Sequence, residues 1–298
     1  MRAVVLGAAA GGGFPQWNCG CPNCRLARAG DPRVTPRTQD SLAVEGARGW
    51  LVVNASPDLP RQIEATPTLH PRGPRDTPIA ALVLTNGDLD HTLGLLSLRE
   101  SQPLHVYATP RVWHGLVERN AVMRTLARFP GQVTFHPLAP GVTCRIAELE
   151  LAVTPFAAPG KLPVHLAQLA EPHPEDNVGL RIEAGGKTLV YATAVSDVRA
   201  VEESLAPCDA LLFDGTFWSS DELVAGGLSA ARAEDMAHQP LSGPRGSLEA
   251  LRTVRGVARR ILTHVNNTNP VLVDGSPERR AAESLGWEIA RDGLEVNL

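Results

Sequence analysis

Residues Ile79–His91 read IAALVLTNGDLDH, an apolar run followed by a polar turn. The six leading apolar residues predict a buried strand, and the next segment, His91–Arg99, predicts a helix. Asp88, Asp90 and His91 therefore fall after a strand and at a helix N-terminus, where α/β folds tend to place their chemistry. Because these ionisable groups contribute little to packing, the turn indicates a metal or a reacting group.

Composition limits the classes of protein to consider. The chain has 298 residues, of which 43% are hydrophobic, enough for a sizeable core. Its formal net charge of −4 favours no nucleic-acid partner. No apolar run approaches the roughly 20 residues of a membrane span, and the apolar N-terminus is too short for a secretory signal. We expect a cytoplasmic protein without a membrane segment; a homodimer stays open.

Strand and helix patterns alternate along the chain. Strands are predicted at Arg2–Leu6, Leu42–Val44, Trp50–Asn54, Leu104–Ala108, Val133–His136, Leu149–Val153, Val178–Glu183, Lys187–Tyr191, Ala210–Asp214 and Arg259–His264, and helices at Pro110–Phe129, Val198–Leu205, Ser247–Val254 and Pro277–Leu285. The glycines between the second and third strands, and Ala184-Gly185-Gly186, predict hairpins. Hairpins among βα units favour an α/β fold with mixed sheets, in a single domain over residues 1–298.

Metal-type ligands follow three of the predicted strands. Asp88, Asp90 and His91 follow the first, Asp214 ends the second and His264 ends the third. If these strands share a sheet with the same polarity at that edge, the groups converge. Asp90, His91 and His264 would then offer two imidazoles and a carboxylate, a set that suits non-haem Fe(II) and tolerates zinc or manganese. Taken singly, Asp88 or Asp90 could instead cap a helix.

The loop at residues 11–25 contains three cysteines in the pattern C-x-C-x-x-C. In a cytosolic chain such a cluster favours metal binding over a disulfide. Cys19, Cys21 and Cys24 predict a structural Zn²⁺ site whose fourth ligand comes from elsewhere in the fold. A redox dithiol is the alternative. The preceding glycines lack the spacing of a phosphate-binding loop.

A family resemblance connects these motifs. Residues 86–91 resemble the H-x-H-x-D-H motif of the metallo-β-lactamase fold, a four-layer αββα sandwich of two mixed sheets with a dinuclear metal site; Asn86 and Asp88 replace its first two histidines. Five segments are similar to the coenzyme PQQ (pyrroloquinoline quinone) synthesis protein B family: GGGFPQWNC at 11–19, DHTLGLL at 90–96, DGTFW at 214–218, HQPLSG at 238–243 and HVNNTNP at 264–270.

The chain departs from the hydrolase pattern at two further positions. Metallo-β-lactamase hydrolases use a third histidine after the middle strands, but residues Val153–Lys161 contain none. Their bridging aspartate follows a strand that resembles Val190–Ala194, where this chain has no acid. Two-metal hydrolysis needs a metal pair that holds both the attacking and the leaving oxygen. The resemblance therefore implies one metal, held by Asp90, His91 and His264, with Asp88 and Asp214 as candidate additional ligands.

The resemblance also implies a reaction. The family acts in PQQ biosynthesis, whose precursor is a peptide in which a glutamate and a tyrosine are cross-linked and then excised. An iron-dependent hydroxylase would add oxygen to the tyrosine ring of that dipeptide product. Fe²⁺ would occupy the two-histidine, one-aspartate set, with Asp88, Asp214 and His238 nearby as proton-handling groups. The expected pocket wall comprises Gln16, Trp17, Asn18 and Trp218, although plain packing would equally explain the two tryptophans.

Two other classes of function remain open at this point. One is a hydrolase with a mononuclear zinc site, which would turn over phosphodiesters or thioesters without dioxygen. The other is a carrier that binds PQQ or its precursor and aids its transport to the periplasm. Such a carrier would need a membrane partner.

Overall fold

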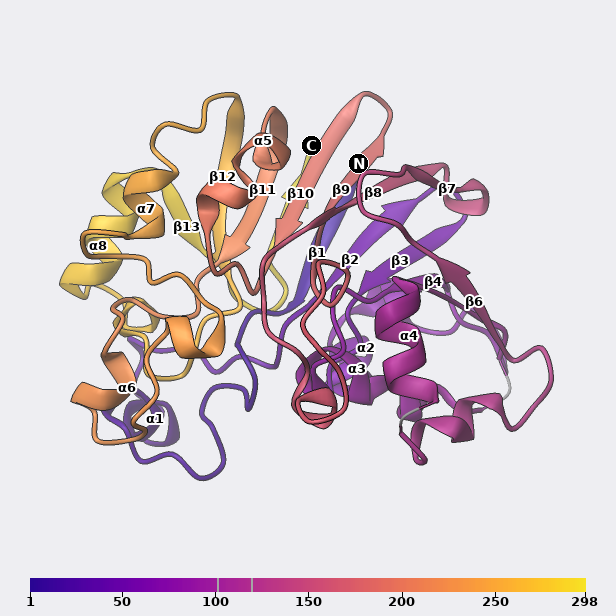
Figure 1. Ribbon diagram of the computed structural model, residues 1–298, viewed down its shortest axis with the longest axis horizontal. Coiled ribbons are helices and arrows are strands. Elements are labelled where there is room, and N and C mark those ends of the chain that lie inside the picture. The colour runs from indigo at the N-terminus through magenta and orange to yellow at the C-terminus, as the bar shows by residue number, and fades with distance from the viewer. Residues whose placement is uncertain (101, 119) are drawn as a thin grey trace.

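The computed structural model describes residues 1–100, 102–118 and 120–298. Over these residues the strands form two seven-stranded sheets that face each other (Figure 1). The first sheet has the order β14 (Glu295–Asn297), β1 (Arg2–Gly7), β2 (Ser41–Gly46), β3 (Gly49–Val53), β4 (Ile79–Val83), β5 (Leu104–Ala108) and β6 (Val133–Pro137). The second has the order β13 (Trp287–Ile289), β12 (Val257–Thr263), β11 (Cys208–Asp214), β10 (Lys187–Ala192), β9 (Val178–Ala184), β8 (Leu151–Ala157) and β7 (Cys144–Ile146).

Both sheets are mixed, as the sequence predicts. Hairpins make β2–β3 and β9–β10 antiparallel. The second hairpin turns through Gly185 and Gly186, whose φ angles of 56° and 74° lie in the left-handed region that glycine adopts without strain. Strands β3 to β6 and β10 to β13 run parallel, so each pair needs a crossover connection.

The helical segments supply these connections. They are α1 (Pro22–Arg28), α2 (Leu59–Ala65), α3 (Leu89–Thr92), α4 (Pro110–Val117), α5 (Glu202–Leu205), α6 (Glu222–Ala225), α7 (Ser247–Ala250) and α8 (Pro277–Ser284), with 3₁₀ turns η1 (Pro67–Leu69), η2 (Leu93–Leu98), η3 (Met123–Ala127), η4 (Ala147–Leu149), η5 (Val164–Leu166), η6 (Val198–Ala200), η7 (Glu234–Met236) and η8 (Pro270–Leu272). In the described part of the chain, no helix has the length and apolar character that crossing a bilayer requires.

Three apolar clusters define four layers. The central cluster joins inward side chains of both sheets, such as Leu51 and Leu212. A second cluster packs α2, α4 and η2 on the outer face of the first sheet. A third packs α5, α7 and α8 on the outer face of the second. Because each buried leucine stabilises the fold by about 2 kcal/mol, this layering dominates the packing energy. The αββα sandwich predicted from the resemblance is confirmed.

Several predicted helices are shorter in the structure. The helix expected over Pro110–Phe129 ends at Val117 and resumes only as η3, because the Asn120 side chain accepts the Val122 N–H and starts a new turn. The helix expected over His91–Arg99 divides into α3 and η2. The predicted helices at Val198–Leu205 and Ser247–Val254 also reduce to short turns. Packing on the sheets, rather than helix length, stabilises these segments.

The candidate functional residues lie along one edge of the sandwich. Strands β11 and β12 are parallel neighbours in which Asp214 pairs with Thr263, so Asp214 and His264 leave the second sheet together. Two isolated bridges, Ala9 with Val265 and Asn86 with Asn177, join segments of the two sheets. The turn after β4 in the first sheet therefore lies against the strand ends of the second.

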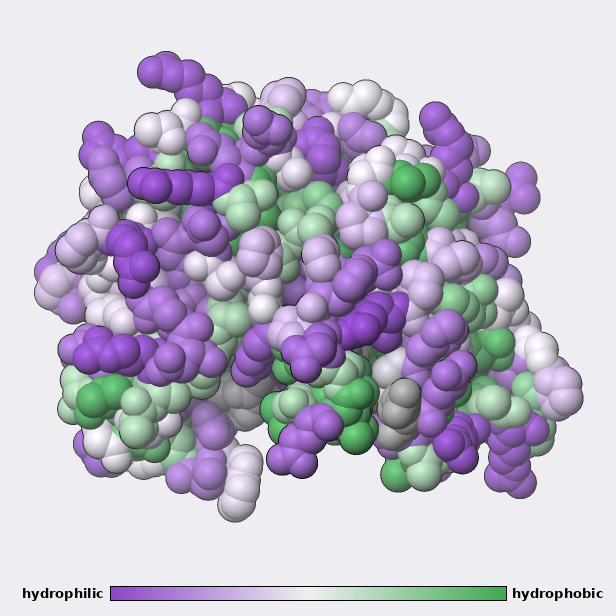
Figure 2. All heavy atoms as spheres, viewed as in Figure 1, coloured by the Kyte–Doolittle hydropathy of each residue, from purple (hydrophilic) through white to green (hydrophobic). Residues whose placement is uncertain are grey.

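Exposed apolar side chains are spread over several elements. They include Trp17, Val122, Val164 and Leu228. The face shown in Figure 2 correspondingly mixes hydrophilic and hydrophobic residues.

Candidate metal centre

Asp90, His91 and His264 come together where β4 and β12 end. Oδ2 of Asp90 lies 3.7 Å from Nε2 of His91 and 3.5 Å from Nε2 of His264. The two imidazole rings are nearly perpendicular, with centroids 5.3 Å apart. The three donor atoms all lie within 4.8 Å of one another, close enough to hold a metal ion. Residues 173 positions apart in the chain therefore form one buried donor set with two imidazoles and one carboxylate.

Two threonines orient the imidazoles. The Thr85 hydroxyl lies 3.2 Å from Nδ1 of His91 and donates to Asn54 Oδ1, so it accepts from the ring N–H. The Thr216 hydroxyl lies 2.8 Å from Nδ1 of His264 and donates to Asp214. Each ring thus carries its proton on Nδ1 and turns Nε2 towards Asp90. This is the tautomer that binds a metal through Nε2.

The environment of His91 fits a cation. Its Nε2 is buried and has no hydrogen-bond partner among the described residues. A buried polar atom left unpaired costs about 1–3 kcal/mol, so a native structure seldom leaves one without a reason. Burial lowers the pKa of His91 and keeps the ring neutral. A neutral ring with a free Nε2 lone pair is a ready metal ligand.

Asp214 and His238 form a second pair that shares His264. Nδ1 of His238 lies 2.7 Å from Oδ2 of Asp214, and the His238 ring stacks on His264 with centroids 5.4 Å apart. Burial opposes the ionisation of Asp214, but the neighbouring His238 holds its pKa to about 2. The carboxylate thus fixes the orientation of His238 beside the donor set.

Negative charge accumulates around these imidazoles. Asp40, which no sequence motif marks, is fully buried, accepts hydrogen bonds from Tyr191 and Thr263, and lies 4.0 Å from Nε2 of His91. Burial raises the pKa of Asp40 to about 6 and, with the charge of Asp90, raises that of Asp88. Burial alone would lower the pKa of His264, but its ion pair with Asp90 and the nearby carboxylates raise it to about 9. A buried excess of carboxylates attracts a divalent cation.

The positions that depart from the hydrolase motif have other partners here. The Asn86 side chain donates to Asn177 Oδ1 at 3.1 Å and accepts the Asp88 N–H at 3.0 Å. Ala194, where hydrolases have the bridging acid, accepts a hydrogen bond from Asn177 through its carbonyl. The Asn86 side chain and the Ala194 carbonyl therefore build structure around the turn. The second group of donor atoms close enough to hold a metal is Asp214, His238 and His264, which shares His264 with the first.

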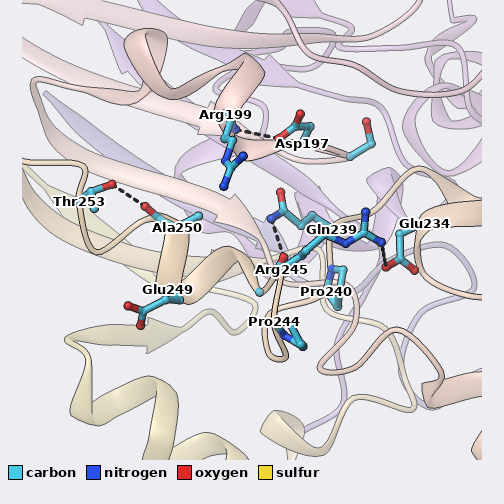
Figure 3. Close-up of a pocket in the computed structure, with 12 residues that line it drawn as sticks. Asp197, Arg199, Glu234, Gln239, Pro240, Pro244, Arg245, Glu249, Ala250 and Thr253 are labelled. Carbon is cyan, nitrogen blue, oxygen red and sulfur yellow. Dashed lines mark hydrogen bonds and ion pairs between the residues drawn. The ribbon is translucent and has the colours of Figure 1, made fainter.

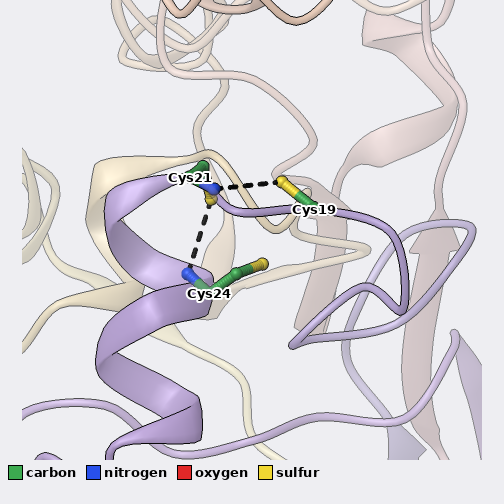
Figure 4. Close-up of side chains that lie close together, drawn as sticks. All are labelled: Cys19, Cys21 and Cys24. Atoms are coloured by element: carbon green, nitrogen blue, oxygen red, sulfur yellow. Dashed lines mark hydrogen bonds between the residues drawn. The ribbon is translucent and has the colours of Figure 1, made fainter.

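The three cysteines also lie together (Figure 4). Their Sγ atoms are within 4.8 Å of one another, and all three thiols are free. Cys21 caps helix α1, since its Sγ accepts the Cys24 N–H at 3.4 Å. Asn267, in the HVNNTNP segment after His264, contacts all three sulfurs, a role that the motif alone does not indicate. Three convergent sulfurs match the donor type of a zinc site.

Two cavities lie next to elements that support the centre, and neither is lined by Asp90, His91 or His264. The cavity of about 310 Å³ lies between the cysteine loop and Phe217, and its lining includes Gln16 and Asn18. The ring edge of Phe217 faces His238. Trp17 and Trp218 are not among its lining residues: Trp17 is 85% exposed, and Trp218 packs on the outer cluster of the second sheet.

The other cavity, of about 530 Å³, contains no predicted site residue (Figure 3). Arg199, Glu234 and Arg245 are among its lining residues. Gln239 forms part of its wall, and the backbone N–H of Gln239 donates to Val195, whose own N–H donates to Asp214. This cavity therefore lies behind the Asp214–His238 pair.

Comparison with known proteins places the centre in a family. A family model described as "Beta-lactamase superfamily domain" matches residues 49–265, the range that includes Asp90, His91 and His264. Coenzyme PQQ synthesis protein B of Methylobacterium nodulans is 47% identical over the full length of both chains. The chain belongs to the coenzyme PQQ synthesis protein B family.

Other members and solved structures agree with this assignment. Coenzyme PQQ synthesis protein B of Azotobacter vinelandii is 41% identical, again over both full lengths. The crystal structure of Zn²⁺-bound PqqB from Methylobacterium extorquens superimposes with a TM-score of 0.94 at 44% identity and covers all of both chains. A diphosphatase of the PhnP family, at 19% identity and a TM-score of 0.67, covers 99% of this chain and 97% of its own and shares the fold alone.

Proposed function

We propose that this member of the family is a mononuclear non-haem iron hydroxylase, which adds oxygen to the tyrosine ring of the cross-linked Glu-Tyr precursor of PQQ. The observation that supports this most is the donor set of Asp90, His91 and His264, in which the buried Nε2 of His91 has no hydrogen-bond partner in the part of the chain that the structure describes. A two-histidine, one-carboxylate set with open positions is typical of non-haem Fe(II) oxygenases. Bound Fe(II) would supply the activation of dioxygen.

The chain's own residues would hold and move protons around the substrate. Asp214 fixes Nδ1 of His238, which leaves Nε2 of His238 as the base for the ring or phenol proton. Asp88, whose pKa is raised by burial and by Asp90, is suited to hold a proton beside the substrate. The cavity of about 310 Å³, with the polar side chains of Gln16 and Asn18, would receive the polar dipeptide.

The surrounding residues argue against a two-metal hydrolase. Asn86 and Ala194 offer neither an imidazole nor a carboxylate where a second metal would need them. Without a metal pair, a hydrolase of this fold lacks the usual means of activating water and stabilising the leaving oxygen. We also propose that Cys19, Cys21 and Cys24 hold a structural Zn²⁺ that fixes the loop beside the substrate cavity.

The test is anaerobic reconstitution with Fe(II), followed by exposure to dioxygen, the cross-linked dipeptide and a reductant such as ascorbate. One oxygen atom enters the ring and the other leaves as water, so the reductant must supply two electrons. We expect the wild type to yield dipeptide that has gained one oxygen atom, seen by mass spectrometry. His91→Ala and His264→Ala should lose this product.

A matched control is His114→Ala, because the side chain of His114 is 59% exposed on α4. It should retain the wild-type rate. Full hydroxylation by either ligand variant, or product formation without dioxygen, would overturn the proposal.

A further inference from the structure

The side-chain amide of Asn267 faces all three cysteine sulfurs at once. Its terminal nitrogen lies 3.1 Å from Sγ of Cys19, 3.6 Å from that of Cys21 and 3.3 Å from that of Cys24. Asn267 is only 3% exposed, so this position is built into the fold. An NH₂ group has two hydrogens and cannot donate well to three sulfurs. Hydrogen bonding alone is therefore an incomplete account of the contact.

Tetrahedral zinc geometry accounts for the position better. With Zn–S near 2.3 Å and Zn–O near 2.0 Å, an oxygen ligand lies about 3.5 Å from each sulfur. A half-turn of the planar amide about its Cβ–Cγ bond exchanges Nδ2 for Oδ1 at this place. We propose that Asn267 supplies the fourth ligand, through Oδ1, to the zinc held by Cys19, Cys21 and Cys24.

The backbone around Asn267 is held by helix α1, which contains Cys24 and is capped by Cys21. Nδ2 of Asn23 in α1 donates to the carbonyls of Asn267, at 3.2 Å, and Asn269, at 2.9 Å. The Cys21 thiol lies 3.7 Å from the Asn267 carbonyl. The amide of Asn267 is thus presented to the sulfurs on a fixed backbone, which is what a metal ligand requires.

The segment from His264 to Asn267 also links this zinc to the proposed iron site. Asn266 N–H donates to the carbonyl of Thr216, whose hydroxyl contacts Nδ1 of His264. Release of Asn267 from the zinc would therefore loosen the residues that orient His264. This second effect rests on the proposed iron site, whereas the zinc ligand rests only on the proposed cysteine site.

The test compares Asn267→Ala with Asn267→Asp by chelator competition for zinc. An aspartate keeps an oxygen donor but has no N–H, so it separates a ligand from a hydrogen-bond donor. We expect Asn267→Ala to bind zinc at least about tenfold more weakly and Asn267→Asp to bind it as tightly as the wild type. Asn266→Ala is the matched control, because its amide bonds to Thr268 rather than to the sulfurs, and it should keep wild-type zinc affinity.

Unchanged zinc affinity in Asn267→Ala, or an equal loss in the alanine and aspartate variants, would overturn the fourth-ligand assignment. If the aspartate variant does not fold, Asn267→His provides the second measurement. It should retain ¹¹³Cd in place of zinc with a chemical shift moved from the wild-type value, because a nitrogen replaces an oxygen ligand. An unmoved shift would contradict direct ligation.

Fe(II) titration without dioxygen tests the link to His264. Zinc-depleted Asn267→Ala should bind Fe(II) about tenfold more weakly than the wild type, within the range for loss of an orienting partner, while Asn267→Asp should match the wild type. Unchanged Fe(II) affinity would refute the link and leave the zinc ligand standing. Wild-type protein without zinc would instead refute the proposed cysteine site, and wild-type protein that binds no Fe(II) would refute the proposed iron site.

Discussion

The imidazole–carboxylate centre and the cysteine cluster are assembled in opposite ways. Asp90, His91 and His264 follow strands of two different sheets. Thr85 orients His91 from the same turn, whereas Thr216 orients His264 from a segment 48 residues away. The cysteines lie within six consecutive residues, and one of them caps the helix that follows. The first centre needs the whole sandwich before its atoms meet, whereas the second needs one turn and a single contact from residue 267.

The two centres also differ in the type of their donor atoms. Nitrogen and oxygen donors with a free position suit a metal that takes part in a reaction, and sulfur donors that close around a tetrahedral ion suit a structural metal. On the proposed assignments, the chain has one open centre for a reactive metal and one closed centre that fixes a loop. The predictions below test whether the two centres can be changed separately.

The largest expected effect is at the charged ligand. Asp90→Asn removes the carboxylate that pairs with both imidazoles. We expect Fe(II) affinity to fall about a hundredfold and hydroxylation to be lost, while zinc stoichiometry stays at the wild-type value. Metal analysis and anaerobic titration would check both. Loss of zinc together with iron would show that the centres are not separable.

Cys21→Ser is the corresponding experiment at the cysteine cluster. It should lose about one zinc per chain and lower the thermal midpoint by several degrees, because the loop loses its cross-link. Circular dichroism during heating, with metal analysis, gives the measurement. The isolated Cys144→Ser, on β7, is the control and should keep its zinc. Unchanged zinc content in Cys21→Ser would contradict the cysteine site.

A smaller effect is expected at the threonines that orient the rings. Thr85→Val keeps the shape of the side chain but removes the oxygen that accepts from Nδ1 of His91. Loss of such a partner typically weakens metal binding about 10- to 100-fold. Anaerobic Fe(II) titration would measure it, with Thr143→Val on an exposed loop as the control. Equal affinity in Thr85→Val and wild type would mean that the ring is oriented by packing alone.

The smallest effect concerns Glu222, beside the cysteine centre. It accepts hydrogen bonds from Trp218 N–H and the Thr268 hydroxyl, and burial raises its pKa to about 7 from an ordinary value of 4.5. The folded state then binds more protons than the unfolded state between these two pH values, so stability falls as pH rises through that window.

Glu222→Gln should reduce the loss in the free energy of unfolding over this pH range by about 1–3 kcal/mol. Denaturant unfolding at pH 4.5 and pH 7.5 would measure the free energy of unfolding in both proteins. Parallel pH profiles for wild type and variant would contradict a raised pKa at Glu222.

The sequence allowed the fold to be predicted because its motifs occur in order along nearly the whole chain. The donor set could be proposed because Asp90, His91 and His264 each follow an apolar strand. The expectation that these strands share one sheet is wrong: β4 belongs to the first sheet and β12 to the second, and the donors meet because the two sheets pack face to face. Helix lengths could not be predicted, because local partners such as the Asn120 side chain end helices that their apolar pattern would continue.

Asp40, Thr85, Thr216 and Asn267 could not be assigned a role from the sequence for another reason. Thr85, Thr216 and Asn267 lie inside the motifs themselves, but a motif does not show which atoms they contact. Asp40, Thr216 and Asn267 act on residues far away in the chain, whereas Thr85 contacts His91 six positions later. Their positions become visible only once the two sheets are placed face to face. Sequence patterns thus indicate the proposed ligands, and only the structure identifies the residues that orient them.

X-ray absorption at the iron edge, on protein loaded with Fe(II) without air, tests the central claim most directly. We expect one iron per chain with nitrogen and oxygen neighbours, no sulfur neighbour and no second metal nearby, and His264→Ala should abolish this signal. A metal–metal distance of about 3.5–4 Å, as in two-metal hydrolases, would contradict a mononuclear centre built on Asp90, His91 and His264.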